Sequence, residues 1–127
     1  MSENSYASEA KDRWGDTDAY KESQQRMSKY SKEDIAKAQQ AMQDATDLVL
    51  KAMLAGFSAD SPEAMAGAEA HRQSISDWWY QCSYEIHTGL ATMYLADPRF
   101  TAHYEGQHAG FAKYIHDSIV ANAAKNA

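Results

Sequence analysis

Apolar residues recur every three or four positions along most of this chain, a spacing that places them on one face of an α-helix. The densest run spans residues 71–100, and its apolar positions are Ile75, Trp78 or Trp79, Cys82, Ile86, Leu90, Met93 and Leu95. Ser83 interrupts the run. Because a serine hydroxyl competes for backbone amides and favours helix starts, we expect one helix to end near Tyr80 and a second to begin at Ser83.

Helix-start and helix-stop signals divide the rest of the chain. A capping sequence at 31–34 and a repeat of apolar and small residues predict a helix over 32–55 that stops at Gly56. Ser61-Pro62 and Asp97-Pro98 each combine a cap with a proline at the first helical position, where its missing amide costs nothing. They predict a helix after residue 61 and a short one ended by Gly106. A last helix is expected from about 108 to 124.

The first thirty residues are polar, and their few bulky apolar side chains bury too little surface to offset the entropy of ordering. Short helices are predicted over 9–14 and 18–29, divided by Gly15. Two interpretations stay open: an arm that orders only when something binds, or a frayed terminus.

These elements predict an all-α fold with a globin-like packing of five or six helices and a conditionally ordered N-terminal arm. A chain of 127 residues has room for one hydrophobic core. We therefore expect a single domain, with residues 1–30 as an arm or lid and residues 31–127 as the helical binding core.

Composition and charge argue against several classes of function. The net charge of −6 and the absence of a basic patch argue against direct contact with nucleic acid. No apolar run approaches the length of a membrane span or has the form of a signal peptide, so we expect no membrane partner and a cytoplasmic location. The single cysteine excludes an internal disulfide.

Reactive and metal-ligating side chains give weak signals. Cys82 could serve as a nucleophile, since the helix that starts after Ser83 points its positive end toward it, or it could pack as a small buried side chain. The histidines show no HExxH and no paired CxxC, so no metal site is predicted. His87 and His103 could ligate haem in a globin-like fold, but their spacing does not require it. We predict no cofactor.

Aromatic residues are more informative. They supply more flat, amphipathic surface than a core of this size requires, and two interpretations remain: they line a concave site for a large, flat, mostly apolar ligand, or they fill the core. The residues in question are Trp14, Trp78, Trp79, Tyr80, Tyr84, Tyr94 and Tyr104.

Three blocks, in order, resemble the TipA-type antibiotic-binding domain, TipAS: RWGDTDAYKES at 13–23, DWWYQCSYEIHTGLATMYLADPRF at 77–100 and GFAKYIHDSIVANA at 110–123. The resemblance implies a non-enzymatic, globin-like domain that binds thiopeptide antibiotics such as thiostrepton. Such domains usually follow a MerR-type DNA-binding domain, which this sequence lacks, so we expect a free-standing form that sequesters the drug and confers resistance. Two alternatives remain: an effector-sensing module of a MerR-type regulator, and a haem- or gas-binding globin relative.

The resemblance also implies a covalent step, because thiopeptides carry electrophilic dehydroalanine that family members trap with a cysteine thiolate. In our alignment that cysteine falls at Gly89, whereas Cys82 matches a neighbouring cysteine. We therefore expect mainly reversible binding, with Cys82 as the only possible point of attachment.

The expected site is a groove between the two helices that flank Cys82, closed by the arm that carries Trp14. Aromatic rings would stack on ligand heterocycles, and Asp16 would accept hydrogen bonds from ligand amides. The predicted ligand-binding residues are Trp14, Asp16, Tyr20, His71, Trp78, Trp79, Tyr80, Cys82, His87, Tyr94 and Tyr104.

Overall fold

The computed structural model of the protein describes residues 17–126, which form six α-helices and no strand. The all-α prediction is therefore confirmed for this part of the chain. The predicted helix over 9–14 lies outside the described residues, as do Trp14 and Asp16. The helices are α2 (Asp18–Met27), α3 (Lys32–Leu54), α4 (Pro62–Trp78), α5 (Tyr84–Ala96), α6 (Pro98–Glu105) and α7 (Phe111–Lys125).

Side-chain caps start the helices where the sequence predicted them. Ser31 accepts a hydrogen bond from the amide of Asp34, whose carboxylate accepts one from Ser31 in return, so α3 opens with a capping box. The hydroxyls of Ser61 and Ser83 cap α4 and α5 in the same manner. Asp97 caps α6, which starts with a proline. The break between α4 and α5 thus lies where it was predicted.

The start of α7 differs from the prediction by three residues. The sequence pattern placed it at about residue 108, but the helix begins at Phe111 after Gly110, which adopts a left-handed conformation with φ of +85°. The carboxylate of Glu105 accepts hydrogen bonds from the amides of Gly110 and Ala112, both at 2.9 Å. A side chain from the preceding helix therefore caps α7. The spacing of apolar residues around the start of α7 does not indicate this cap.

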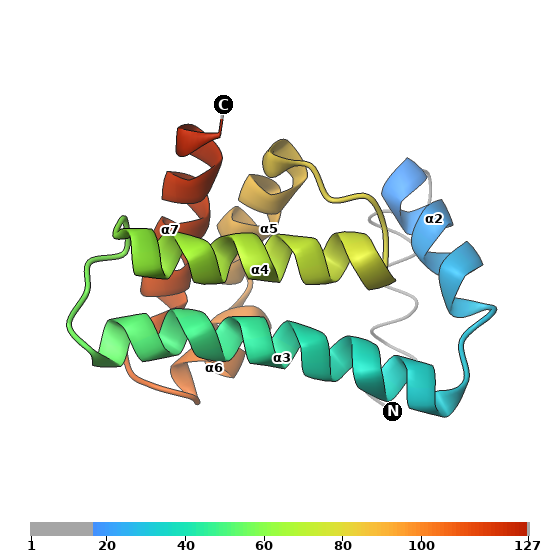
Figure 1. The fold of residues 1–127 in the computed structure, drawn as a ribbon, viewed down its shortest axis with the longest axis horizontal. Helices are drawn as coiled ribbons and strands as arrows, with labels where there is room; N and C mark the ends of the chain where they lie inside the picture. The colour runs from blue at the N-terminus through green and yellow to red at the C-terminus, as the bar shows by residue number, and fades with distance from the viewer. Residues whose placement is uncertain (1–16, 127) are drawn as a thin grey trace.

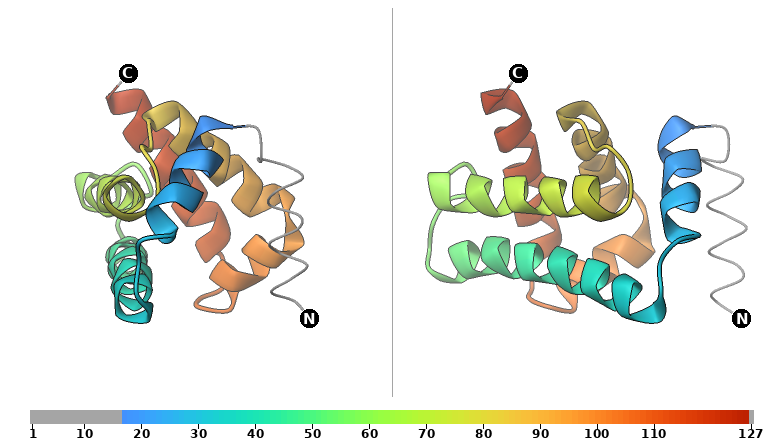
Figure 2. Two further views of the ribbon diagram at one scale, coloured as in Figure 1. Left: turned by 90° about the vertical axis from the view of Figure 1, so that its right-hand side faces the viewer. Right: turned by 45° about the vertical axis from the view of Figure 1, so that its right-hand side comes forward.

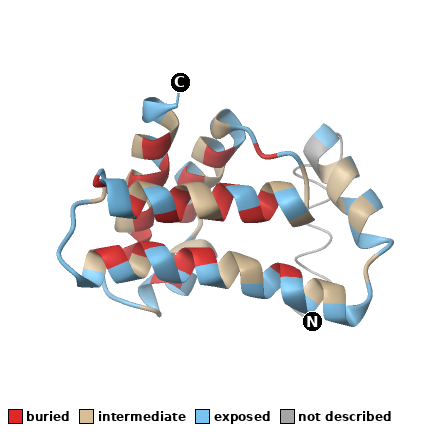
Figure 3. Cartoon of the chain, viewed as in Figure 1, coloured by how far each residue is buried: buried red, intermediate tan, exposed pale blue. Residues whose placement is uncertain are grey.

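The helices pack in a globin-like arrangement. Helices α3 and α4 lie side by side and run in opposite directions, while α5 and α7 cross behind them and α6 closes one side (Figures 1 and 2). Buried positions lie on the faces that these helices turn toward one another (Figure 3). The core cluster consists of Val49, Ala68, Ala91, Tyr94, Tyr104, Phe111, Ala112, Ile115 and Ile119.

Helix α2 stands apart from the core at one end of the molecule, beside the end of α4 (Figures 1 and 2). Arg26 donates a hydrogen bond of 2.7 Å to the carbonyl of Ser76, and the amide of Gln81 donates one of 3.0 Å to Glu22. The hydroxyl of Tyr30 donates to the carbonyl of Trp78. The predicted helix over 18–29 is thus present, although it ends at Met27. None of the described helices combines the length and the apolar character needed to cross a membrane.

Candidate ligand-binding groove

A groove of about 810 Å³ opens between α2 and the adjoining parts of α4 and α5. Such a volume falls within the range of small-molecule binding sites. Five helices, the residue that caps α2 and the turn after α4 contribute to it. Its lining residues are Thr17, Asp18, Tyr20, Ser23, Gln24, Met42, Ile75, Trp79, Tyr80, Ile86, Gly89, Leu90, Met93, Tyr94 and Phe100.

The two sides of the groove differ in chemistry. Ile86, Leu90 and Met93 follow one another at spacings of three and four along α5, so they form one apolar stripe. Ile75 and Trp79, four residues apart, extend this apolar side at the end of α4. The opposite side, on α2, presents hydroxyl, amide and carboxylate groups. A flat apolar ligand with amides along one edge would satisfy both sides.

Four of the predicted aromatic residues line this groove: Tyr20, Trp79, Tyr80 and Tyr94. Burial raises the pKa of Tyr80 and Tyr94 far above the usual value for a phenol, so both hydroxyls stay neutral at physiological pH. The indole Nε1 of Trp79 is buried and has no hydrogen-bond partner in the described part of the chain. The groove lining therefore combines aromatic rings with hydroxyls that carry no charge.

Two further predicted aromatics lie outside the groove lining. Tyr104 is buried behind Tyr94, with ring centroids 4.9 Å apart, and supports that side of the groove from the core. Trp78 instead packs edge-to-face on Tyr30, at 5.8 Å between centroids. Of the two adjacent tryptophans, only Trp79 lines the groove.

The predicted histidines are brought together, but beneath the groove surface. His71 and His87 are fully buried, and Nδ1 of His71 lies 2.9 Å from Nε2 of His87. Burial lowers the pKa of His71 to about 4 and that of His87 to about 3, so both rings are neutral near pH 7. The ring of His71 packs edge-to-face on Tyr94. The histidine pair therefore supports Tyr94, a residue of the groove lining, from the core side.

His87 and His103 do not lie together at a site where both could ligate haem. His87 is occupied by its contact with His71, whereas His103 is exposed and packs against Tyr104. Neither histidine lines the groove. Among residues 17–126, moreover, no three histidine, cysteine, aspartate or glutamate side chains gather as a metal site would require.

Cys82 is fully buried in the turn between α4 and α5 and does not line the groove. Its carbonyl accepts a hydrogen bond from Arg72 at 2.7 Å, and its amide donates one to Ser76 at 2.9 Å. Burial raises the pKa of the thiol to about 11, although the Arg72 guanidinium opposes this. Cys82 therefore has the burial and the raised pKa that are typical of a packing residue.

Sequence reasoning did not assign several apolar groove residues to the site, because their helical spacing is the same as that of core residues. Gly89 also lines the groove on α5, and a Cβ atom added there would meet nothing within 4 Å. The resemblance drew attention to this position, since it is where the family's cysteine falls. The apolar residues not assigned were Met42, Ile75, Ile86, Leu90, Met93 and Phe100.

Comparison with known proteins identifies the family. Residues 6–122, nearly the whole chain, match the TipAS antibiotic-recognition domain. The chain belongs to this family. As a TipAS domain it is a binding module and not an enzyme, and this assignment favours recognition of an antibiotic over the haem-binding alternative.

Relatives of this TipAS domain include longer regulators. It is 42% identical over 121 residues to the HTH-type transcriptional activator TipA of Streptomyces coelicolor and to that of Streptomyces lividans. Each alignment covers 95% of this chain and 48% of the relative, so the chain spans about half the length of these proteins. The HTH-type transcriptional activator mta of Bacillus subtilis is 31% identical over 61 residues.

Two solved structures share the fold. TipAS of a thiopeptide antibiotic multidrug resistance system from Streptomyces lividans, in complex with nosiheptide, superposes with a TM-score of 0.88 at 41% identity, over 97% of this chain and 86% of that one. The antibiotic-binding domain of a TipA-class multidrug resistance transcriptional regulator gives a TM-score of 0.64 at 42% identity, over 70% of this chain and 95% of that one.

Proposed function

We propose that this TipAS domain binds thiopeptide antibiotics in the groove between α2, α4 and α5 and thereby sequesters them. The observation that carries the proposal is the aromatic, apolar groove of about 810 Å³ in a chain that matches a nosiheptide-bound TipAS at a TM-score of 0.88. Sequestration lowers the free concentration of a drug without changing it chemically. The expected consequence for the cell is low-level resistance.

The proposed binding mode follows from the two sides of the groove. Flat heterocycles of the ligand stack against Trp79, Tyr80 and Tyr94, whose rings bury large areas at little cost in side-chain entropy. Ligand amides face α2, where Asp18 and Gln24 supply hydrogen-bonding groups. The roles of Trp14 and Asp16 remain predictions from the sequence.

Residues 1–30 act as a lid over the core formed by residues 31–127 in this proposal. Helix α2 supports it, because this helix contributes one whole side of the groove yet carries no residue of the core cluster. A helix held mainly by polar contacts has little intrinsic stability, so a ligand that adds apolar contact would stabilise the closed state. Affinity then depends on the arm.

The proposed binding is reversible. A thiol at position 89 would face the ligand, but this chain has glycine there, and its one cysteine is buried outside the groove lining with a raised pKa. Thiolate addition to dehydroalanine requires both access and ionisation, and Cys82 offers neither.

A second candidate function is the effector-sensing module of a MerR-type regulator. It is favoured by the relatives, which are HTH-type transcriptional activators about twice as long as the matched region. Both functions use the same groove and place the protein in the cytoplasm. Sequencing the reading frame upstream of residue 1 distinguishes them, because a DNA-binding domain there would make this chain a sensor.

Titration with thiopeptides tests the proposed function. Trp79 lines the groove, so nosiheptide or thiostrepton should change the tryptophan fluorescence saturably, with one ligand bound per chain. A Trp79→Phe variant should give a smaller signal, because the indole that lines the groove is the reporter. Absence of any spectral change at concentrations well above micromolar would argue strongly against thiopeptides as the ligand class.

A further inference from the structure

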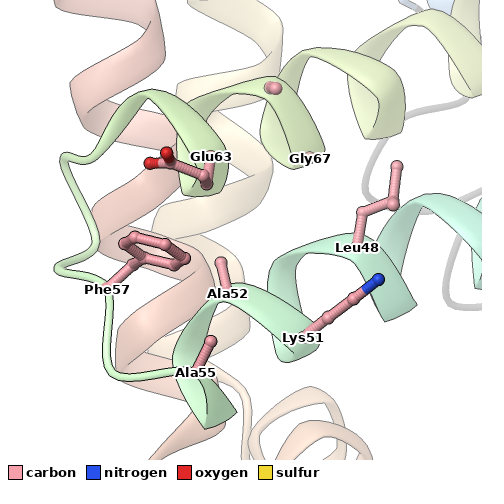
Figure 4. A pocket seen from close by; sticks show the side chains of 8 residues that line it. Leu48, Lys51, Ala52, Ala55, Phe57, Glu63 and Gly67 are labelled. Carbon is pink, nitrogen blue, oxygen red and sulfur yellow. The ribbon is translucent and has the colours of Figure 1, made fainter.

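The two ends of α4 are fixed in different ways. At its start, Ser61 caps the helix by accepting a hydrogen bond of 3.1 Å from the amide of Ala64. Further along, Gly67 lies so close to α3 that an added Cβ would be 2.8 Å from Cγ2 of Val49. A small hollow of about 200 Å³ adjoins this contact, with Phe57 at its edge (Figure 4). The start of α4 is therefore held by its own cap and by its packing on α3.

The end of α4 lacks two common stop signals of a helix. Its last turn contains no basic residue, and it is followed by Trp79, Tyr80 and Gln81 rather than by a glycine. The last carbonyls of an α-helix have no amide partner within the helix itself. Donors from another part of the chain are therefore needed to complete this end.

Helix α2 and the loop after it supply these donors, beside the end of α4 (Figures 1 and 2). Nη1 of Arg26 donates a hydrogen bond of 2.7 Å to the carbonyl of Ser76, which places a cation at the negative end of the α4 dipole. The hydroxyl of Tyr30 donates to the carbonyl of Trp78. The ring of Tyr30 packs edge-to-face on Trp78 and Trp79, with centroids 5.8 and 6.5 Å apart. These contacts form a C-terminal cap on α4.

Glu22 extends the cap to the turn after α4. Its carboxylate accepts a hydrogen bond of 3.0 Å from the amide of Gln81 and pairs with Arg26, one helical turn further along α2. Trp79 and Tyr80, which both line the groove, immediately precede Gln81 in the sequence. The backbone that carries these two rings is therefore held by α2 on both sides.

We infer that Glu22, Arg26 and Tyr30 are positioning residues for the ligand, because they cap α4 and thereby orient Trp79 and Tyr80 in the groove. The inference rests on the proposed function of the groove. None of the three positioning residues is among the described residues that line it, so a change in any of them alters ligand affinity indirectly. Closing the lid and ordering the two rings are then a single event, since the same hydrogen bonds do both.

Amide hydrogen exchange in the ligand-free chain tests the cap. Arg26→Ala and Tyr30→Phe should each raise the exchange rates of the Trp79 and Tyr80 amides, which close the last turn of α4, by about three- to tenfold. Tyr30→Phe keeps the ring and removes only the hydroxyl, so the fold should be retained. Gln25→Ala, at an exposed position of α2, is the matched control and should change neither rate. Unchanged exchange of these amides in the two variants would overturn the cap.

Glu22 allows a conservative rescue. Glu22→Ala should speed exchange of the Gln81 amide, whereas Glu22→Gln keeps an oxygen that can accept its hydrogen bond and should restore most of the protection. Equal loss of protection in both variants would mean that Glu22 does not hold this turn through the Gln81 amide, and would remove it from the positioning residues.

A double variant separates positioning of the ring from the contacts that α2 itself makes with ligand. If Arg26 acts through Trp79, Arg26→Ala should weaken thiopeptide binding by about tenfold in the unaltered chain but by only about twofold in a Trp79→Ala background. Isothermal titration calorimetry measures both. Equal factors in the two backgrounds would overturn the inference. Absence of thiopeptide binding by the unaltered chain would refute the proposed function instead, and the exchange rates would still decide whether α2 caps α4.

Discussion

Nδ1 of His71 lies 2.9 Å from Nε2 of His87, and this contact joins the middle of α4 to the start of α5 in a fully buried environment. Two neutral imidazoles can share one proton in such a contact, whereas two imidazolium ions would repel each other. His71 Nε2 and His87 Nδ1 have no other partner among the described residues. The contact is therefore lost once both rings are protonated.

This pair should make the protein labile in mild acid. The pKa values in the folded state, about 4 and about 3, lie below the usual histidine value of 6.5, so the unfolded chain takes up protons first as pH falls. The free energy of unfolding is thus undiminished above pH 6.5 and falls as pH drops toward 4. The slope should reach about 1.4 kcal/mol per pH unit for each histidine. Urea unfolding at a series of pH values measures it.

A double variant isolates the pair. His71→Leu combined with His87→Leu should flatten the profile between pH 6.5 and 4.5, while His108→Gln, a change at an exposed histidine, should leave it unchanged. The acidic limb below pH 4.5 should survive in both variants. Glu69, whose pKa is lowered to about 2 by its hydrogen bonds to Arg72, loses its contribution there. A slope that persists in the double variant would assign the lability to other groups.

Trp79 should be the main anchor for ligand in the groove. Trp79→Ala removes the largest ring of the groove lining and should weaken thiopeptide binding by about 2–4 kcal/mol, as truncation of a buried aromatic anchor commonly does. Leu95→Ala is the control, because Leu95 is exposed on α5 and does not line the groove. Isothermal titration calorimetry compares the two. Equal losses in both variants would mean that the ligand binds elsewhere.

Trp79 also illustrates what sequence can and cannot predict. Helical spacing left Trp78 and Trp79 as alternatives, because a helix end can turn either one inward. Trp79 lies at the end of α4, where its backbone amide bonds to the carbonyl of Ile75 and its ring lines the groove. The ring of Tyr30 packs edge-to-face on both Trp78 and Trp79, and its hydroxyl donates to the carbonyl of Trp78. Tyr30 lies 48 positions before Trp78 in the sequence, so a local pattern cannot include these contacts.

Helix starts were predicted well because their causes are local. Ser31, Ser61, Ser83 and Asp97 each bond an amide two or three residues further on, so each start is encoded within a few positions. The start of α7 depends instead on Glu105, which lies in another helix.

The groove was predicted less completely, because apolar residues that line a groove have the same helical spacing as those that fill a core. Only the way the helices pack separates the two. Leu90, for example, lines the groove and also packs against the core cluster.

The polar contacts of α2 should control how far the lid is closed. Arg26→Ala removes the hydrogen bond to the carbonyl of Ser76 and the ion pair with Glu22. Amides of α2 should then exchange faster with solvent and thiopeptide affinity should fall, while the melting temperature of the core stays nearly constant. Hydrogen exchange with and without ligand measures this. In the unaltered chain, equal and strong protection of α2 in both states would contradict a lid.

Two glycines in helices should respond to alanine in opposite directions. Gly67→Ala would place Cβ 2.8 Å from Cγ2 and 2.9 Å from the backbone nitrogen of Val49, which forces α3 and α4 apart. The expected destabilisation is about 1–3 kcal/mol. Gly89→Ala meets nothing within 4 Å and should stabilise α5 by roughly 0.5–1 kcal/mol through helix propensity. Urea unfolding of the two variants gives both values, and a neutral Gly67→Ala would show that the helices can separate at no cost.

Position 89 should decide whether the ligand is held covalently. Gly89→Cys introduces a thiol on the exposed side of α5, within the groove lining and clear of neighbouring atoms, so it is accessible where the thiol of Cys82 is not. Incubation of this variant with a dehydroalanine-containing thiopeptide should give a one-to-one adduct by intact-mass spectrometry, because a thiolate adds to the alkene once the two are held together.

Two comparisons make this last experiment decisive. The unaltered chain should release the ligand intact under denaturing conditions, and Gly89→Ser should do the same, since it adds similar bulk without a thiol. A rapid, stoichiometric adduct on the unaltered chain that disappears in Cys82→Ser would instead make Cys82 the nucleophile. That result would require the turn between α4 and α5 to open during binding, because the Cys82 thiol is fully buried and its pKa is raised to about 11.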